Sequence, residues 1–357
     1  MNSQCRWIAH CVASVFWVVL VGGGSGCDAL KSMTDKPAAP PAPPAPVMET
    51  PAPAPVAPVA PPLVVKTPQQ IIEEFLALTS VEKTDENLKQ VAELKEGLDA
   101  IKSLDLSRSS VSDDGMKVLT AFPKLAELNL SETRISNAGL ASVAEVKSLR
   151  SITLVRLRGV DDSGIKNLAP LKDLESLTVS VCSVTDGILP SLAEFEGLQV
   201  LNLAGNPDIY GKDFKVLLAK GAFRNLRELI VTGSKFGFYG LEQMNKLPQL
   251  EVLRAGSCEL LGPAISGLDG CDGLRVLDLS GNSLQDANMQ GVSRLKKLEE
   301  LRLARLNLTD KCLDSIKTMR NLKVLDLNGT QVTEKSILLL KEKFLGDTEI
   351  LALEKKF

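Results

Sequence analysis

Residues that could carry out catalysis are scarce in this chain, and the most versatile of them lie at one end. The only histidine, His10, and both tryptophans, Trp7 and Trp17, fall within the first 17 residues. If that segment is removed, no histidine-based triad or histidine metal site can form. The glycine run at 22–24 belongs to the same N-terminal segment, so it is not a phosphate-binding loop between a strand and a helix. We therefore expect no enzyme activity, no cofactor, no metal ion and no small-molecule substrate.

The side chains best suited to binding are aromatic and lie close together in the sequence. Both tyrosines of the protein, Tyr210 and Tyr239, fall with Phe238 on turn positions that are polar elsewhere. Amphipathic aromatic residues grouped on one edge are typical of protein-interaction hot spots. Alternatively, they pack on one another to seal a repeat that is longer than its neighbours, and this second interpretation is preferred. Tyr210, Phe238 and Tyr239 are therefore candidate partner-binding residues with both interpretations open.

A second candidate surface consists of four charged residues at a regular spacing, Arg254, Asp278, Arg302 and Asp326. If they occupy neighbouring strands, their charges alternate in sign, and opposite charges on adjacent strands attract one another modestly. Two interpretations compete. The arginines bind an anionic ligand, or the four residues neutralise one another as a self-paired ladder, which we favour.

One sequence pattern, repeated from Leu98 to the C-terminus, must supply the elements that position these residues. Leu, two residues, Leu, one residue and Leu precede a polar turn, Gly-Leu and a short amphipathic run, as in LAELNLSETRISNAGLASVAEVKS. Eight of the nine steps between strand centres are 24 or 25 residues, and the step from Leu201 to Leu229 is 28. The expected centres are Leu104, Leu128, Ile152, Leu177, Leu201, Leu229, Leu253, Leu277, Leu301 and Leu325. A unit this short cannot bury its own apolar face, so the repetition predicts a solenoid.

Each repeat predicts one strand and one short helix. Leu128 and Leu130 alternate with polar residues in the manner of a half-buried strand. Ser136 or Asn137 then provides a helix N-cap, and the same signal recurs in most repeats. Strands should therefore line one face of a curved stack and helices the other.

This core and spacing resemble the leucine-rich-repeat family over residues 98–357, with about ten repeats and a closing strand near Leu351–Leu353. The resemblance implies an α/β solenoid with parallel strands on the concave face and short helices on the convex face. It also implies protein recognition, although the family binds many kinds of partner. The consensus T-x-I-[ST]-[DN]-x-G-L is similar to repeats of eukaryotic ubiquitin-ligase adaptors, whose F-box domain has no counterpart here.

The ends of the solenoid need caps. Residues 67–97 predict two helices that begin at Thr67-Pro68 and Thr84-Asp85 and form the N-terminal cap. The charged tail 354–356 should protect the edge of the last strand.

The cysteines predict thiols rather than disulfides. Cys182 and Cys258 occupy an inward turn position that carries Thr or Asn in sister repeats. They are three repeats apart, which at ~4.8 Å per strand separates the sulfurs by about 14 Å, too far for a disulfide. Cys271 and Cys312 fall on helix positions. We expect four free, buried thiols.

The N-terminal segment, residues 1–26, has the features of an export signal, with Arg6 before an apolar stretch and small residues before Cys27. Gly24-Ser25-Gly26-Cys27 resembles a bacterial lipobox, which implies lipid attachment at Cys27, although Gly24 stands where that motif usually has Leu. An uncleaved apolar anchor and an ordinary cleaved signal stay open. All three place the repeats outside the cytoplasm. We expect an exported protein that is anchored in the membrane on the periplasmic or surface side.

Between the signal and the repeats, residues 28–66 form a Pro/Ala-rich linker. Such a composition cannot build a core and favours extended polyproline II, which at ~3.1 Å per residue spans up to roughly 120 Å.

Together these features predict an envelope-tethered leucine-rich-repeat module that binds another protein. The net charge of −3 gives no reason to expect nucleic acid as a partner. A structural envelope component with no dedicated ligand is the alternative. A carbohydrate or peptidoglycan binder comes third, because the expected concave face offers few aromatic side chains to stack on sugars.

Overall fold

The structure is a computed structural model that describes residues 66–242 and 244–357. The export signal, Cys27 and the linker up to residue 65 lie outside the described residues. The predictions for these segments therefore remain predictions.

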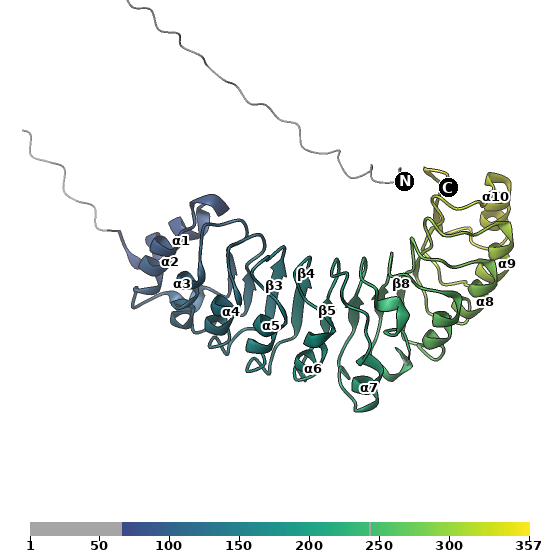
Figure 1. Cartoon of the computed structure of the whole chain (residues 1–357). Coiled ribbons are helices and arrows are strands. Elements are labelled where there is room, and N and C mark those ends of the chain that lie inside the picture. Colours follow the sequence, from purple (N-terminus) through teal and green to yellow (C-terminus); the bar gives the residue numbers. More distant parts are fainter. Residues whose placement is uncertain (1–65, 243) are drawn as a thin grey trace, which may run out of the picture. The chain divides into compact units, whose positions relative to one another are not determined.

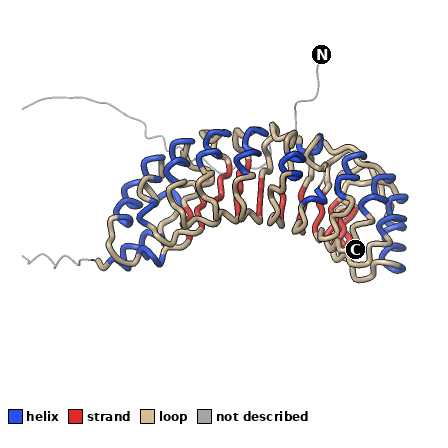
Figure 2. The backbone as a smooth tube through the Cα atoms, turned by 90° about the horizontal axis from the view of Figure 1, so that it is seen from below, coloured by secondary structure: helices blue, strands red, loops and turns tan. Residues whose placement is uncertain are grey.

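Within the described residues, twelve strands form one sheet in the order of the sequence. Strands β1 to β11 are parallel, and β12 folds back antiparallel to β11. The strands line the inner face of a curved stack and the helices its outer face (Figures 1 and 2). The strands are β1 Ser103–Asp105, β2 Glu127–Asn129, β3 Ser151–Val155, β4 Ser176–Ser180, β5 Val200–Asn202, β6 Glu228–Ile230, β7 Val252–Arg254, β8 Val276–Asp278, β9 Glu300–Arg302, β10 Val324–Asp326, β11 Glu349–Ala352 and β12 Lys355–Lys356.

The register confirms the predicted strand centres. Leu104 pairs with Leu128, Leu128 with Ile152, and each later predicted centre with the next. All ten centres are buried and form part of a continuous apolar core along the stack. Because the side-chain period of a strand is two, this register sends every second residue to the concave face.

Short helices on the outer face alternate with the strands. The α-helices are α1 Pro68–Ala77, α2 Asp85–Ala92, α3 Asp113–Met116, α4 Asn137–Val143, α5 Asp162–Asn167, α6 Leu189–Leu192, α7 Phe214–Ala219, α8 Met289–Val292, α9 Leu313–Ile316 and α10 Glu334–Lys343. The 3₁₀ helices are η1 Ser80–Glu82, η2 Leu98–Ala100, η3 Leu119–Ala121, η4 Asp186–Ile188, η5 Phe236–Phe238, η6 Met244–Lys246, η7 Gly262–Leu268, η8 Asp286–Asn288 and η9 Asp310–Cys312.

The first two helices, α1 and α2, precede β1 at the N-terminal end of the stack (Figure 1). Thr67 and Thr84 each form a capping box with the residue three positions later. The buried Lys83 joins this segment to the first repeat, because its ammonium donates to the carbonyl of Asp105 at 3.0 Å. At the C-terminal end, the charged tail 354–356 forms part of the sheet. It turns at Leu353 and Glu354, both with positive φ, and pairs along β11 as β12.

The four cysteines within the described residues are free, as predicted, but one is only half-buried. Cys258, Cys271 and Cys312 are buried, whereas Cys182 is partly exposed. The amides of Cys182 and Cys258 each donate at 2.9 Å to an asparagine side chain of the next repeat, Asn206 or Asn282. This column therefore satisfies backbone groups from inside the turns, as the sequence indicated.

Candidate functional site

Neighbouring repeats are joined by side chains at the turn from strand to helix. In most repeats the residue after the N-cap accepts hydrogen bonds from the N-cap residue of the next repeat. Asp162, for example, accepts from the amide of Thr185 at 2.7 Å and from its hydroxyl at 2.5 Å. We call this arrangement the inter-repeat latch. Its members are Asp85 with Ser112, Asp113 with Ser136, Asn137 with Asp161, Asp162 with Thr185, Asp186 with Tyr210, Asp286 with Thr309, and Asp310 with Thr333.

The latch explains the glycine of the Gly-Leu motif. A Cβ added at Gly139 would lie 2.3 Å from Oδ1 of Asp113, and one added at Gly187 would lie 2.4 Å from Oδ2 of Asp162. At these two interfaces the glycine leaves room for the oxygen of the preceding repeat, whereas Cys312 and Ser336 occupy the same position at the last two latches. Where Cys312 takes this position, burial and the carboxylates of Asp286 and Asp310 raise the pKa of its thiol to about 12.

Three consecutive interfaces between repeats lack the latch. At the position that elsewhere carries Asp or Asn, the chain has Gly211, Phe238 and Gly262. The N-cap positions of the same repeats carry Tyr210, Gly237 and Leu261 in place of a polar residue. Backbone contacts join these repeats instead, including Lys235 N to Ile209 O at 3.0 Å and Gly237 N to Cys258 O at 3.0 Å. The polar turn column is therefore interrupted over one continuous stretch of the solenoid.

The interruption leaves apolar side chains accessible. The exposed fraction is 46% for Tyr239 and 56% for Leu261, while Tyr210 is half-buried. We call these three residues the Tyr210–Leu261 patch. Phe238, the third aromatic candidate, is the last residue of η5, directly before Tyr239.

Two lysines flank the tyrosine at one end of the patch. The ammonium nitrogens of Lys212 and Lys235 lie 5.3 Å and 5.4 Å from the centre of the Tyr210 ring. These are cation–π distances. The Lys235 ammonium is also 3.5 Å from the Tyr210 hydroxyl.

Phenylalanines seal the long repeat beneath this surface. Phe214 stacks on Phe223 with ring centres 5.3 Å apart and meets Phe236 edge-on at 5.1 Å. All three rings are buried. Their burial on core positions fills the space that the longer repeat creates.

The four charged candidates on the concave face all have partners, but not the partners that the sequence suggested. Arg254 and Arg302 both contact Glu300, at 3.4 Å and 2.6 Å, so the expected arginine–aspartate pairing is wrong. Asp278 and Asp326 instead accept from the backbone amides two residues later, at 2.9 Å and 3.0 Å. Opposite charges at adjacent positions on the sheet were expected to pair along a single column. The arginines pair with Glu300 because its carboxylate lies within reach of both. The aspartates instead cap the turns that follow their strands.

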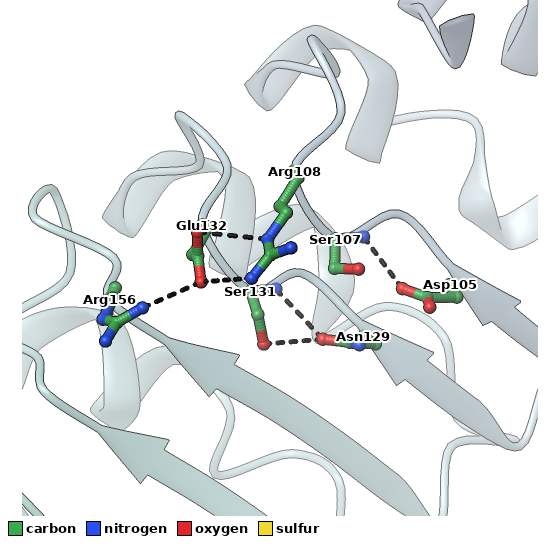
Figure 3. A network of polar contacts seen from close by, with 7 residues as sticks. All are labelled: Asp105, Ser107, Arg108, Asn129, Ser131, Glu132 and Arg156. Atoms are coloured by element: carbon green, nitrogen blue, oxygen red, sulfur yellow. Dashed lines mark hydrogen bonds and ion pairs between the residues drawn. The ribbon is translucent and has the colours of Figure 1, made fainter. Parts of the chain in front are cut away.

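A second polar network lies at the edge of the first three repeats (Figure 3). Glu132 contacts Arg108 at 3.2 Å and Arg156 at 3.1 Å, and all three residues have positive φ. Hydrogen bonding from Arg108 holds the pKa of Glu132 below its usual value, and Arg156 acts in the same direction. Asp105 and Asn129 accept from the amides of Ser107 and Ser131, as Asp278 does farther along the stack. This network links the turns, and the charges of its two arginines are balanced by those of Glu132 and Asp105 (Figure 3).

The opposite edge of the sheet carries a shallow polar recess whose basic residues are paired with carboxylates. Its lining includes Arg150, Lys172 and Arg227. Their carboxylate partners are Asp173 at 3.4 Å, Glu194 at 2.9 Å and Glu251 at 2.6 Å, respectively.

No cluster of three or more His, Cys, Asp or Glu residues that could hold a metal ion occurs in the described part of the chain. In that same part, no helix has the length and apolar character needed to cross a membrane.

Sequence reasoning identified Tyr210, Phe238 and Tyr239 but missed Leu261 and the two lysines. The signal was present, because Leu261 occupies a column that holds Ser or Thr in most other repeats. Comparing that column across all repeats would have shown three consecutive departures.

Comparisons with known proteins agree on the architecture. Neither a protein-family model nor a curated protein matches the sequence. Among solved structures, an internalin from Listeria monocytogenes aligns with a TM-score of 0.52 at 17% identity, covering 75% of this chain and 76% of that chain. TLR13, solved in complex with ssRNA13, aligns with a TM-score of 0.51 at 22% identity, covering 76% of this chain and 38% of that chain.

Proposed function

Since the chain has the leucine-rich-repeat fold, we propose that it is a non-enzymatic module that binds another protein through the Tyr210–Leu261 patch. One observation carries this proposal. Three consecutive repeats exchange a polar latch for apolar residues, and Tyr239 and Leu261 remain 46% and 56% exposed. A latch residue would stabilise the solenoid, whereas an exposed apolar side chain stabilises a complex when a partner covers it.

The packing beneath the patch supports binding over sealing. Phe214, Phe223 and Phe236 already fill the core of the long repeat. Tyrosine and leucine at the surface therefore have accessible area left for a partner. The charged concave face supports binding less, because both arginines already pair with Glu300 and the aspartates cap turns.

The proposal includes a tether to the cell envelope, through lipid on Cys27 followed by the Pro/Ala-rich linker. Its test is the Cys27→Ser variant, followed by separation of membrane and soluble fractions. We expect the variant to lose incorporation of labelled fatty acid and to leave the membrane fraction. Retention in the membrane without fatty acid would point to an uncleaved apolar anchor instead.

The binding proposal is tested by affinity capture with the full chain from detergent-solubilised envelope membranes. The test variant is Tyr210→Ala, Phe238→Ala and Tyr239→Ala together. The matched control is Leu338→Ala and Leu339→Ala on α10, whose side chains are 53% and 47% exposed. We expect one partner to be retained by the wild type and the control and lost by the test variant at an unchanged melting temperature.

Two results would contradict this proposal. A partner captured equally by all three proteins would place binding elsewhere. A test variant that retains the partner but loses about 2–4 kcal/mol of stability per truncated side chain would identify the aromatic residues as packing.

A further inference from the structure

The cationic end of the Tyr210–Leu261 patch lacks a counter-charge. Lys212 is exposed and Lys235 half-buried, and both ammonium groups are held beside the same tyrosine ring. Within residues 66–242 and 244–357, no carboxylate lies within ion-pair distance of either ammonium; this holds for the exposed Asp208 and Asp213 of the same turn. Because both ammonium groups lie at the same ring, an anion placed beside that ring would be attracted by both.

Two carboxylates of this region are already engaged elsewhere. Asp186 accepts from the amides of Tyr210, Gly211 and Lys212 at 2.8, 2.8 and 3.2 Å. Glu242 pairs with Lys215 at 2.7 Å. Their charges are thus committed to the backbone and to a third lysine.

The sign of the charge therefore changes along the patch, from positive at one end to negative at the other. The lysines lie at the Tyr210 end, and the exposed Glu259 lies two residues before Leu261 at the other. Between them are the exposed apolar surfaces of Tyr239 and Leu261. The repeats that carry them are in contact, since the space above Gly211 is filled by Gly240 and that above Gly237 by Leu260.

We propose that the partner presents an acidic side chain next to an apolar one, with the acidic group beside Lys212 and Lys235 and the apolar group over Tyr239 and Leu261. This inference rests on the proposed function and adds the chemistry of the partner and the direction in which its chain lies. Charge complementarity at such a surface sets partner choice and orientation more than total affinity.

The tyrosine content of the chain provides a selective probe. The protein has two tyrosines, and both belong to the patch. Full chain labelled with 3-fluorotyrosine therefore gives ¹⁹F signals from the patch alone, and Tyr239→Phe assigns them. The ligands are three peptides with a central Leu-Phe pair that differ only in the flanking residues, which are Glu, Gln or Lys.

We expect the Glu peptide to shift both signals saturably and to bind more tightly than the Gln peptide, with the Lys peptide weakest. The variant Lys212→Gln and Lys235→Gln should weaken binding of the Glu peptide about tenfold and remove the preference for it. The variant Lys220→Gln and Lys246→Gln alters two exposed lysines outside the patch and should bind as the wild type does.

Equal binding of the three peptides would overturn the inference on charge and leave protein binding at the patch intact. Signals that do not move with any peptide would also overturn it. The capture experiment then decides the proposed function separately, since a partner lost on mutation of the aromatic residues would still support binding there.

Discussion

The amide nitrogen of Ser136 lies 2.8 Å from Oδ1 of Asp113, which belongs to the preceding repeat. The hydroxyl of Ser136 at the same time accepts from the amide of Ala138 and caps its own helix. One serine thus begins a helix and joins two repeats. In a solenoid, stability is close to a sum of repeat and interface terms, so each such contact counts directly toward the whole.

Removing one latch should destabilise the solenoid measurably. Asp113→Ala leaves the amide and hydroxyl of Ser136 without their acceptor, which costs about 1–3 kcal/mol. The neighbouring Asp114→Ala removes an exposed carboxylate whose partner is the exposed Lys117, and should change stability by less than about 0.5 kcal/mol. Urea unfolding followed by circular dichroism measures both. Equal effects of the two substitutions would show that the latch contributes nothing specific.

The glycine behind a latch should be coupled to it. Gly187→Ala brings a Cβ within 2.4 Å of Asp162 Oδ2 and should destabilise the protein. In the background of Asp162→Ala the same change should cost less or become stabilising, because alanine is the better helix former by about 1 kcal/mol. A double-mutant cycle reports the coupling. Additive effects would mean that the latch does not determine the glycine.

Acid should weaken the latch that contains Asp161. Hydrogen bonds from the amide of Ser163 and the side chain of Asn137 hold the pKa of Asp161 below its ordinary value. Its contribution is therefore complete above the unfolded-state pKa of about 3.9 and is lost as the pH falls through the lower folded-state pKa. Asp161→Asn keeps a capping side chain without the titration. The stability difference between wild type and variant should shrink below about pH 4, and a constant difference from pH 7 to pH 2 would refute this account.

The buried thiols should resist alkylation while the protein is folded. Burial, followed by the charges of Asp272 and Asp269, raises the pKa of Cys271 to about 11, and Cys312 reaches about 12. Little of either thiol is ionised at pH 8, so thiolate reactions are slow. Peptide mapping after iodoacetamide treatment should find Cys182 modified first, because it alone among the described cysteines is only half-buried. Modification of Cys312 at the rate found in urea would contradict the packing.

The strand register and the helix caps could be predicted from the sequence because both recur with the repeat period. Leu104 and its successors pair in the expected register because a one-residue slip would expose a whole column of leucines. The caps at Ser136 and Thr185 follow from local chemistry that involves neighbours in sequence. Both kinds of information are contained within a single repeat.

Contacts between repeats were harder to predict. Asp113 and Ser136 are 23 positions apart, and the cap signal gives no sign that the residue after it serves the next repeat. Glu300 likewise lies outside the column of Arg254, Asp278, Arg302 and Asp326, and it contacts both arginines of that column. The aromatic candidates were found by their composition, whereas Leu261 becomes evident only when the loss of the latch is seen as a continuous feature.

The most direct measurement of the central claim is site-specific photo-crosslinking in the native envelope. A benzophenone amino acid replaces Leu261 in one variant and the exposed Leu338 of α10 in another. The account predicts that Leu261 yields one covalent adduct to a protein and that Leu338 yields none. Adducts of equal yield at both positions, or none at Leu261, would contradict the assignment of the Tyr210–Leu261 patch as the binding surface.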